Sequence, residues 1–212
     1  MNREEVTTNN TVELTGLVVG EPTFNHEVYG EKFYQIMLEV RRQSDNTDTL
    51  PVVVSERLVD IGSIKVDQYM RVAGQLRTFN KHSEEHHRAK LIISVFAREI
   101  EEVEEYSDDQ NSVVLRGFIC KEPNFRTTPL GRDICDVLLA INRPYGKSDY
   151  IPNIAWGRNA RYMGNLSVGT EVTVTGRLQS RTYIKKFEGG TEEERTAYEV
   201  SISKMEVHTD EM

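Results

Sequence analysis

Four aromatic residues in the second half of the chain stand among cations, where a strand is expected to be exposed or to end. Single-stranded nucleic acid is held by base stacking on aromatic faces, about 1 to 3 kcal/mol per base, and by a basic groove along the phosphates. Each ring could instead pack in a core or across a hairpin, an alternative that is weakest for Tyr145 and Tyr183, which are expected in loops beside Lys and Arg. The predicted stacking residues are Tyr145, Tyr150, Trp156 and Tyr183. The predicted phosphate contacts are Arg126, Arg132, Arg143, Lys147, Arg158, Arg177, Arg181, Lys185 and Lys186.

The sequence lacks the motifs that mark enzymes. It contains no Gly-rich phosphate loop followed by Lys, no nucleophile elbow and no paired Cys motif, so we expect no catalytic site and no cofactor. The stretch from His82 to His87 combines imidazoles with carboxylates, which can bind metals. The corresponding region of the second half is also polar, so we interpret this stretch as a solvated hairpin loop and predict no metal site.

The charge of the chain is unevenly distributed. The net charge of −8 alone argues against a polyanionic partner, but residues 111–187 carry 12 basic and 5 acidic side chains. Residues 1–106 carry 12 basic and 19 acidic side chains. The second half therefore has a basic footprint that the whole-chain value hides.

The sequence shows no sign of export or membrane insertion. No apolar run approaches the ~18 to 20 residues of a membrane span, and the N-terminus lacks the basic and apolar blocks of a signal peptide. We therefore expect a cytoplasmic protein without a membrane partner. In that compartment Cys120 and Cys135 suit small apolar strand positions better than a disulfide.

The chain contains an internal repeat. At an offset of 101 residues, Asn10 matches Asn111, and after one inserted residue Gly74 matches Gly176 at an offset of 102. Such coincidences of Gly and Pro over about 90 residues indicate a duplication. We therefore predict copy one at residues 1–100, an acidic linker at 101–110 and copy two at 111–208. The other matched pairs include Gly16 with Gly117, Pro22 with Pro123, Gly30 with Gly131, Pro51 with Pro152 and Gly62 with Gly164.

The apolar period within each copy is two, which predicts strands. In copy two we expect five, near 112–121, 133–142, 150–156, 171–180 and 198–207, with a short helix at 159–166. Copy one has residues 58–64 at the place of that helix. Five antiparallel strands with a helix after the third describe an OB barrel, so the predicted fold is all-β, with two tandem five-stranded OB barrels, each with a short helix between strands 3 and 4. An immunoglobulin-like sandwich is the rival, but it needs about seven strands in a similar length.

Five separated blocks of copy two resemble, in order and spacing, the OB domain of bacterial single-stranded DNA-binding proteins. The resemblance places the stacking aromatics of that family at Tyr145, Tyr150, Trp156 and Tyr183. The blocks are NSVVLRG at 111–117, RTTPLG at 126–131, LAINRP at 139–144, DYIPNIAWG at 149–157 and VTGRLQSRTY at 174–183.

Copy one departs from this pattern. Its equivalent positions hold Ser44, Thr49, Ser55 and Lys81, and the nearest aromatic is Phe79. The stretch LPVVVS at 50–55 looks more like the primosomal replication protein n branch of the same superfamily. Without these rings, copy one is expected to be either a weak binder that uses charge alone or a scaffold for assembly, and its net negative charge favours the scaffold.

The resemblance implies a non-enzymatic protein that binds single-stranded DNA with little sequence preference, in replication, recombination or repair. Two alternatives stay open: an assembly module of a primosome or plasmid replication complex, and an OB protein that binds single-stranded RNA. The acidic tail with which the family recruits replication proteins is expected to be absent, which puts such partners in doubt. Because the family gathers four OB domains, we expect a homodimer, with the strands at 11–19 and 112–120 as candidates for pairing between barrels. Pairing of the two copies inside one chain is the other outcome.

Overall fold

Extended strands make up most of this chain, as its period-two pattern predicts. The computed structural model describes residues 9–42, 44, 46–82, 89–104, 111–186, 190 and 192–208, without the side chains of residues 81, 82, 89, 90 and 186. Copy one contains β1 (Asn10–Val18), β2 (Thr23–Val28), β3 (Glu31–Arg41), β4 (Thr47–Ser55), the 3-10 turn η1 (Ile61–Ser63), β5 (Tyr69–His82) and β6 (Ala89–Glu102). Copy two contains β7 (Asn111–Ile119), β8 (Asn124–Thr127), β9 (Asp133–Asn142), the 3-10 turn η2 (Pro144–Gly146), β10 (Ser148–Trp156), α1 (Gly157–Met163), β11 (Glu171–Lys186) and β12 (Glu192–His208).

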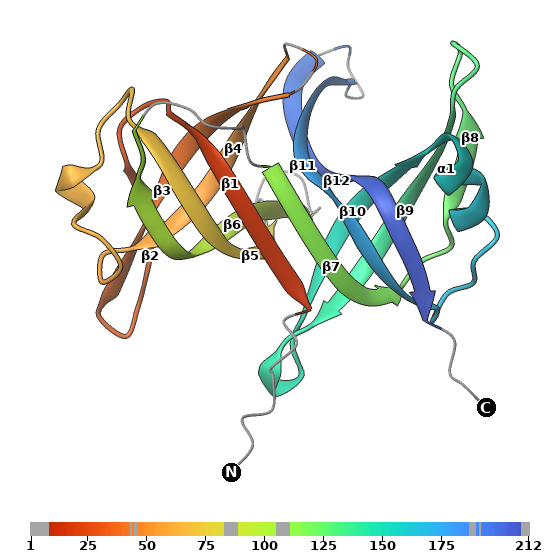
Figure 1. Cartoon of the computed structure of the whole chain (residues 1–212), viewed down its shortest axis with the longest axis horizontal. Coiled ribbons are helices and arrows are strands. Elements are labelled where there is room, and N and C mark those ends of the chain that lie inside the picture. The colour runs from red at the N-terminus through yellow and green to blue at the C-terminus, as the bar shows by residue number, and fades with distance from the viewer. Residues whose placement is uncertain are drawn as a thin grey trace.

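The two copies pair their strands in the same way (Figure 1). In copy one, five strands form a closed circuit in the order β1, β3, β4, β6 and β5, which returns to β1. In copy two, β7, β9, β10, β12 and β11 form the equivalent circuit. The β4–β6 and β10–β12 pairs are parallel, and the other pairs are antiparallel. The repeat in the sequence is therefore a repeat in strand topology.

The core lies inside these circuits and uses equivalent residues in both copies. Leu14, Leu38 and Leu76 are fully buried in copy one. Their counterparts Leu115, Leu139 and Leu178 are fully buried in copy two. The buried residues of both copies join in one apolar cluster, whose burial is the main favourable contribution to folding.

Two glycines that the repeat pairs are required by close backbone approach. A Cβ at Gly176 would lie 2.2 Å from the carbonyl oxygen of Ser201, and one at Gly74 would lie 2.2 Å from that of Phe96. Each glycine lies at a β-bulge, between Thr175 and Gly176 or between Ala73 and Gly74. The sharp curvature of the long strands β5 and β11 therefore depends on residues without a side chain.

The structure adds elements that the sequence pattern did not predict. The short strands β2 and β8 pair with β3 and β9, and they are exposed along their whole length, so no apolar alternation marks them. The expected helix of copy two is α1, which buries Ala160 and Met163. In copy one the same place holds only the turn η1, because β-branched Val59 and Ile61 and the flexible Gly62 disfavour an α-helix. No helix among the described residues is long and apolar enough to cross a membrane.

The copies join by antiparallel pairing of β1 with β7 within the chain (Figure 1). Val12 faces Val113, while Asn10 faces Leu115 and Leu14 faces Asn111. Because these partners are equivalent residues, the register has a local two-fold symmetry centred between Val12 and Val113. The strands proposed for pairing between barrels thus pair inside one chain.

The same symmetry places one aspartate of each copy against a strand of the other. Oδ1 of Asp48 accepts hydrogen bonds from the backbone N–H of Ser180, at 2.7 Å, and from its hydroxyl, at 2.9 Å. In the equivalent contact Oδ1 of Asp149 accepts the backbone N–H of Thr78 at 2.7 Å. Arg42 pairs with Asp48 at 2.6 Å, and Asp149 lies 2.9 Å from both Arg77 and Arg143. Both carboxylates are fully buried, so these contacts fix how the copies sit against each other.

Candidate nucleic-acid interface

The outer face of β10, β12 and β11 gathers several of the predicted site residues. Side chains alternate along a strand, and directly paired residues share a face. Ile154 pairs with Ser201 and Ser201 with Arg177, so this face carries Trp156, two residues beyond Ile154. Continuing the alternation, it carries Tyr150 on β10, Glu199, Ala197 and Arg195 on β12, and Gln179, Arg181, Tyr183 and Lys185 on β11. We call this set of strand residues the copy-two face.

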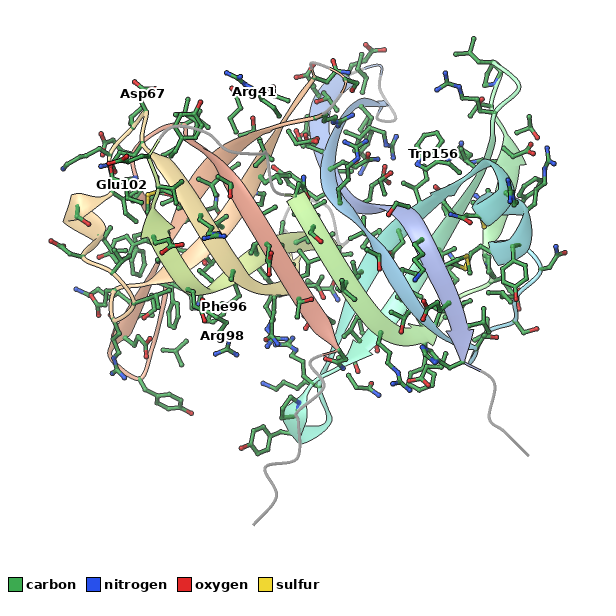
Figure 2. The ribbon with its side chains drawn as sticks, viewed as in Figure 1. Arg41, Asp67, Phe96, Arg98, Glu102 and Trp156 are labelled. Carbon is green, nitrogen blue, oxygen red and sulfur yellow. The ribbon has the colours of Figure 1, made fainter. Side chains whose placement is uncertain are left out.

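Trp156 ends β10 on the upper side of copy two (Figure 2). Its side chain is 40% exposed, and its indole Nε1–H donates to the hydroxyl of Ser201 at 3.1 Å. This bond satisfies the polar edge of the ring and fixes the ring's orientation. A base could therefore stack on the part of the indole that solvent reaches.

Tyr183 and Arg181 follow each other along the same face of β11. The guanidinium carbon of Arg181 lies 5.7 Å from the centroid of the Tyr183 ring, a cation–π distance. Nε of Arg181 is 3.8 Å from Glu199, which also accepts a 2.9 Å hydrogen bond from Gln179. Arg181 stays 58% exposed, so this pair offers a ring and a positive charge side by side.

The other two predicted rings lie toward the start of β10. Tyr150 is 46% exposed, and its backbone N–H donates to the hydroxyl of Thr78 in copy one at 2.9 Å. Tyr145 is completely exposed in the turn η2, where its φ of 64° is left-handed. This ring is fully accessible to a ligand.

The nine predicted phosphate contacts are in different environments. Arg132, Lys147 and Arg158 are exposed, and Arg126 forms an exposed ion pair with Asp136 at 2.8 Å. Lys185 is half-buried, and the side chain of Lys186 lies outside the described residues. The strand register therefore puts Arg177, Arg181 and Lys185 on the same face as Trp156 and Tyr183, spread along β11. Arg126 and Arg132 belong to the β8–β9 hairpin, Lys147 follows Tyr145 by two residues, and Arg158 follows Trp156 by two residues.

Two of these cations take part in the contact between the copies. Arg143 is 27% exposed and pairs with buried Asp149. Arg177 bonds Gln179 at 3.2 Å and approaches Asp48 of copy one to 3.9 Å. Burial, and next the neighbouring charge of Arg42, lower the pKa of Arg177. Any role of Arg143 and Arg177 toward a ligand would come in addition to this contact.

Sequence patterns missed the polar partners of this face. Ser201, Glu199 and Gln179 orient Trp156 and Arg181, and Arg195 lies opposite Tyr183 on β12. Their alternation along the strands was visible in the sequence, but their partners depend on the β11–β12 register. The sequence does not reveal this register, so it could not identify these residues as partners of Trp156 and Arg181.

Copy one has no ring at the equivalent positions that the structure describes. Ser44 and Thr49 are exposed, and the hydroxyl of Ser55 donates to Glu31. The side chain of Lys81 lies outside the described residues, as does most of the stretch from His82 to His87. Phe79, the nearest aromatic named above, is 51% exposed.

Cysteine thiols and possible metal ligands can also be assessed among the described residues. Burial raises the pKa of the Cys135 thiol to about 11 and raises that of Cys120, so both stay protonated at neutral pH. Among the residues whose side chains are described, no group of three or more His, Cys, Asp or Glu could hold a metal ion.

Comparisons with known proteins find relatives of the second half of the chain. Residues 110–208 match the single-strand binding protein family. Single-stranded DNA-binding protein 1 of Staphylococcus aureus is 40% identical over 80 residues, which cover 34% of this chain and 48% of that protein. The chain thus spans about half the length of the curated relatives it matches.

Solved structures extend the likeness to the whole chain. The single-stranded DNA binding protein of Thermus aquaticus aligns over 94% of this chain and 93% of its own, with a TM-score of 0.75 at 20% identity, which shows a shared fold. The N-terminal domain of PriB from Thermoanaerobacter tencongensis is 42% identical over 46% of this chain and all of its own, with a TM-score of 0.40. The second half of the chain, residues 110–208, is thus similar to the single-strand binding protein family.

Proposed function

We propose that this chain binds single-stranded DNA in the cytoplasm, without catalysis and with little sequence preference, in replication, recombination or repair. The observation that carries the proposal is the copy-two face, where exposed Trp156 on β10 and exposed Tyr183 on β11 lie on one face with β12 between them, and Arg181 lies against the tyrosine ring. Stacking tolerates any base because every base has a π-face. Duplex DNA is disfavoured because its paired bases cannot lie flat on such rings.

The proposed roles are assigned according to the two copies of the repeat. Residues 1–100 and 111–208 would each be an OB barrel, joined by the acidic linker 101–110, with the closed strand circuits in support. The four aromatics Tyr145, Tyr150, Trp156 and Tyr183 would stack bases. Exposed cations such as Arg132, Lys147, Arg158 and Arg181 would neutralise phosphates.

Titration of labelled oligonucleotides tests the proposal. The single strand should bind much more tightly than the duplex of the same sequence, and homopolymers of different bases should bind with similar affinity. Equal affinity for single strand and duplex would contradict stacking. Competition between DNA and RNA of one sequence distinguishes the RNA-binding alternative, and negligible binding of both would favour the assembly module.

We also propose that two chains associate as a homodimer with four OB domains. Because β1 and β7 already pair within the chain, the contact would use other surfaces. Light scattering at micromolar protein should give twice the 24.3 kDa of one chain, and a mass near one chain would exclude the dimer.

A further inference from the structure

The outer face of β5 and β6 in copy one carries its own aromatic and cationic side chains. Gln75 pairs with Phe96, Arg77 with Ser94, and Phe79 with Ile92, so these residues share one face. Figure 2 shows Phe96 and Arg98 on the lower side of copy one, whereas Trp156 is on the upper side of copy two. We call Gln75, Arg77, Phe79, Phe96 and Arg98 the copy-one face.

The aromatic ring at the centre of the copy-one face lies on a different strand from the corresponding ring of copy two. Val53 pairs with Phe96 in the β4–β6 contact, as Ile154 pairs with Ser201 in the β10–β12 contact. Ser55 is therefore the counterpart of Trp156, and Phe96 is the counterpart of Ser201. Copy two has its ring on β10 with serine opposite, and copy one has serine on β4 with its ring on β6.

Rings and a guanidinium pack around Phe96. The guanidinium carbon of Arg98 lies 5.3 Å above the Phe96 ring, and Phe33 contacts that ring at a centroid distance of 5.6 Å. His26 stacks on Phe33 at 4.6 Å with an interplanar angle of 5°. Arg98 is exposed, so it presents a planar cation whose orientation Phe96 supports. Unpaired bases stack on guanidinium planes as well as on aromatic rings.

A chain of polar contacts leads from Arg98 to copy two. Gln75 Oε1 accepts hydrogen bonds from Arg98 at 3.5 Å and from Arg77 at 2.5 Å. Arg77 lies 2.9 Å from Asp149, which also pairs with Arg143. Next along the chain, the Tyr150 N–H bonds Thr78, between Arg77 and Phe79. The copy-one face therefore adjoins the start of β10, which carries Tyr150 and follows the turn η2 with Tyr145.

The charge of this route is positive although copy one as a whole is acidic. Arg77 and Arg143 pair with one carboxylate, Asp149, which is fully buried, and Arg98 bonds Gln75. The acidic end of β6 begins at Glu99, beyond the bulge at Gly74, and Glu101 there pairs with Arg71 at 3.0 Å. The route from Arg98 through Gln75 and Arg77 to Asp149 and Arg143 therefore contains three cations and one carboxylate.

We propose that the copy-one face is a second contact surface for single-stranded nucleic acid, continuous with the Tyr145 and Tyr150 end of copy two. The proposal rests on the function proposed above and extends it. Phe79, which is 51% exposed, stacks a base. Arg98 either stacks on a base or neutralises a phosphate, and Arg77 neutralises a phosphate. Copy one then lengthens the binding site, in addition to its part in assembly.

The test compares two lengths of labelled oligothymidine. One has about 10 nucleotides, within the range of one OB fold, and the other has about 30 nucleotides. For Phe79→Ala and Arg98→Ala, affinity for the long strand should fall at least about fivefold, and affinity for the short strand should stay within about twofold. Arg98→Ala should also lower the slope of log affinity against log salt by about 0.7 for the long strand, as one lost phosphate contact predicts.

Matched controls use exposed residues of copy one outside this face. Phe24→Ala removes a ring that is 60% exposed, and Arg57→Ala removes a cation whose side chain is 69% exposed. Both should leave long-strand affinity unchanged, and thermal melting checks that all variants fold. If Phe79→Ala and Arg98→Ala bind the long strand like the parent chain, the copy-one face is not a contact surface. If the parent chain itself binds neither length, the proposed function fails first.

Discussion

Trp156 is the single residue whose environment most resembles a stacking platform. Its N–H is satisfied within the protein by Ser201, so its exposed ring atoms serve no packing purpose that the structure requires. Ser201 itself is 9% exposed, which holds that hydrogen bond in a protected place. Orientation of the ring before a ligand arrives reduces the entropy that binding must overcome.

Trp156→Ala should weaken oligonucleotide binding by about 1 to 3 kcal/mol with little loss of thermal stability. The chain has one tryptophan, so quenching of its fluorescence by unlabelled oligonucleotide reports stacking at this ring directly. Ser55→Ala, at the equivalent position of copy one, is the control and should bind normally. A Trp156→Ala protein that unfolds would show instead that the ring is needed for packing.

Removing Arg181 and removing Arg143 should have different effects, although the sequence predicted a phosphate contact for both. Arg181 is 58% exposed, so Arg181→Ala should lower the salt slope of binding by about 0.7 and leave the melting temperature unchanged. Arg143 faces a buried carboxylate, so Arg143→Ala should cost about 1 to 3 kcal/mol of stability. Denaturant titration beside binding at several salt concentrations separates the two effects. Equal stability of both variants would contradict a structural role for Arg143.

At the scale of elements, the bulges of β5 and β11 set the shape of both copies. The backbone at Gly176 approaches Ser201 so closely that no side chain fits. Gly176, which the curvature of β11 requires, is therefore also next to Ser201, the residue that orients Trp156. Strand geometry and the candidate site are therefore linked through Ser201.

Gly176→Ala should destabilise the protein by more than about 2 kcal/mol, because its Cβ would meet backbone rather than a flexible side chain. Gly62→Ala is the matched control, since the nearest atom to its Cβ would be a carboxylate oxygen of Asp60 at 3.4 Å. The midpoint of urea unfolding measures the stability of both variants. A Gly176→Ala protein as stable as the Gly62→Ala protein would show that the bulge can move without cost.

The sequence predicted the strands that alternate and are buried on one side, because burial leaves a mark on every second residue. It did not predict β2 and β8, whose exposed faces carry no such mark. The four aromatics of copy two were identified by type and spacing. Phe96 was missed, because comparing equivalent positions one by one cannot detect a ring that has moved to the neighbouring strand.

At the scale of the whole molecule, two buried aspartates bind the copies together, and Asp48 makes this contact sensitive to acid. Burial raises the pKa of Asp48, but hydrogen bonds from Arg42 and Ser180 outweigh burial, so the pKa lies below its ordinary 3.8. A carboxyl with a depressed folded pKa contributes stability above its unfolded pKa. That contribution is lost as the pH falls from about 4 through the lower folded value.

Asp48→Asn should cost about 2 to 4 kcal/mol at neutral pH, because Arg42 then loses its buried partner. The variant should also lose less stability than the parent chain between about pH 5 and pH 2. Asp136→Asn, which removes an exposed ion pair with Arg126, should change stability by less than about 1 kcal/mol. Unfolding curves across this pH range make the comparison. Parallel pH profiles for parent and Asp48→Asn would exclude this linkage.

The pairing of β1 with β7 has a consequence for how the two copies can differ. Two separate chains that met through this register would part on dilution, whereas tethered strands meet at an effective concentration near the millimolar range at any protein concentration. In an assembly of identical chains, each substitution would also appear on both sides of the symmetry axis. The fused chain escapes that restriction, so one side can carry Trp156 opposite serine while the other carries Phe96, and the two sides are free to specialise independently.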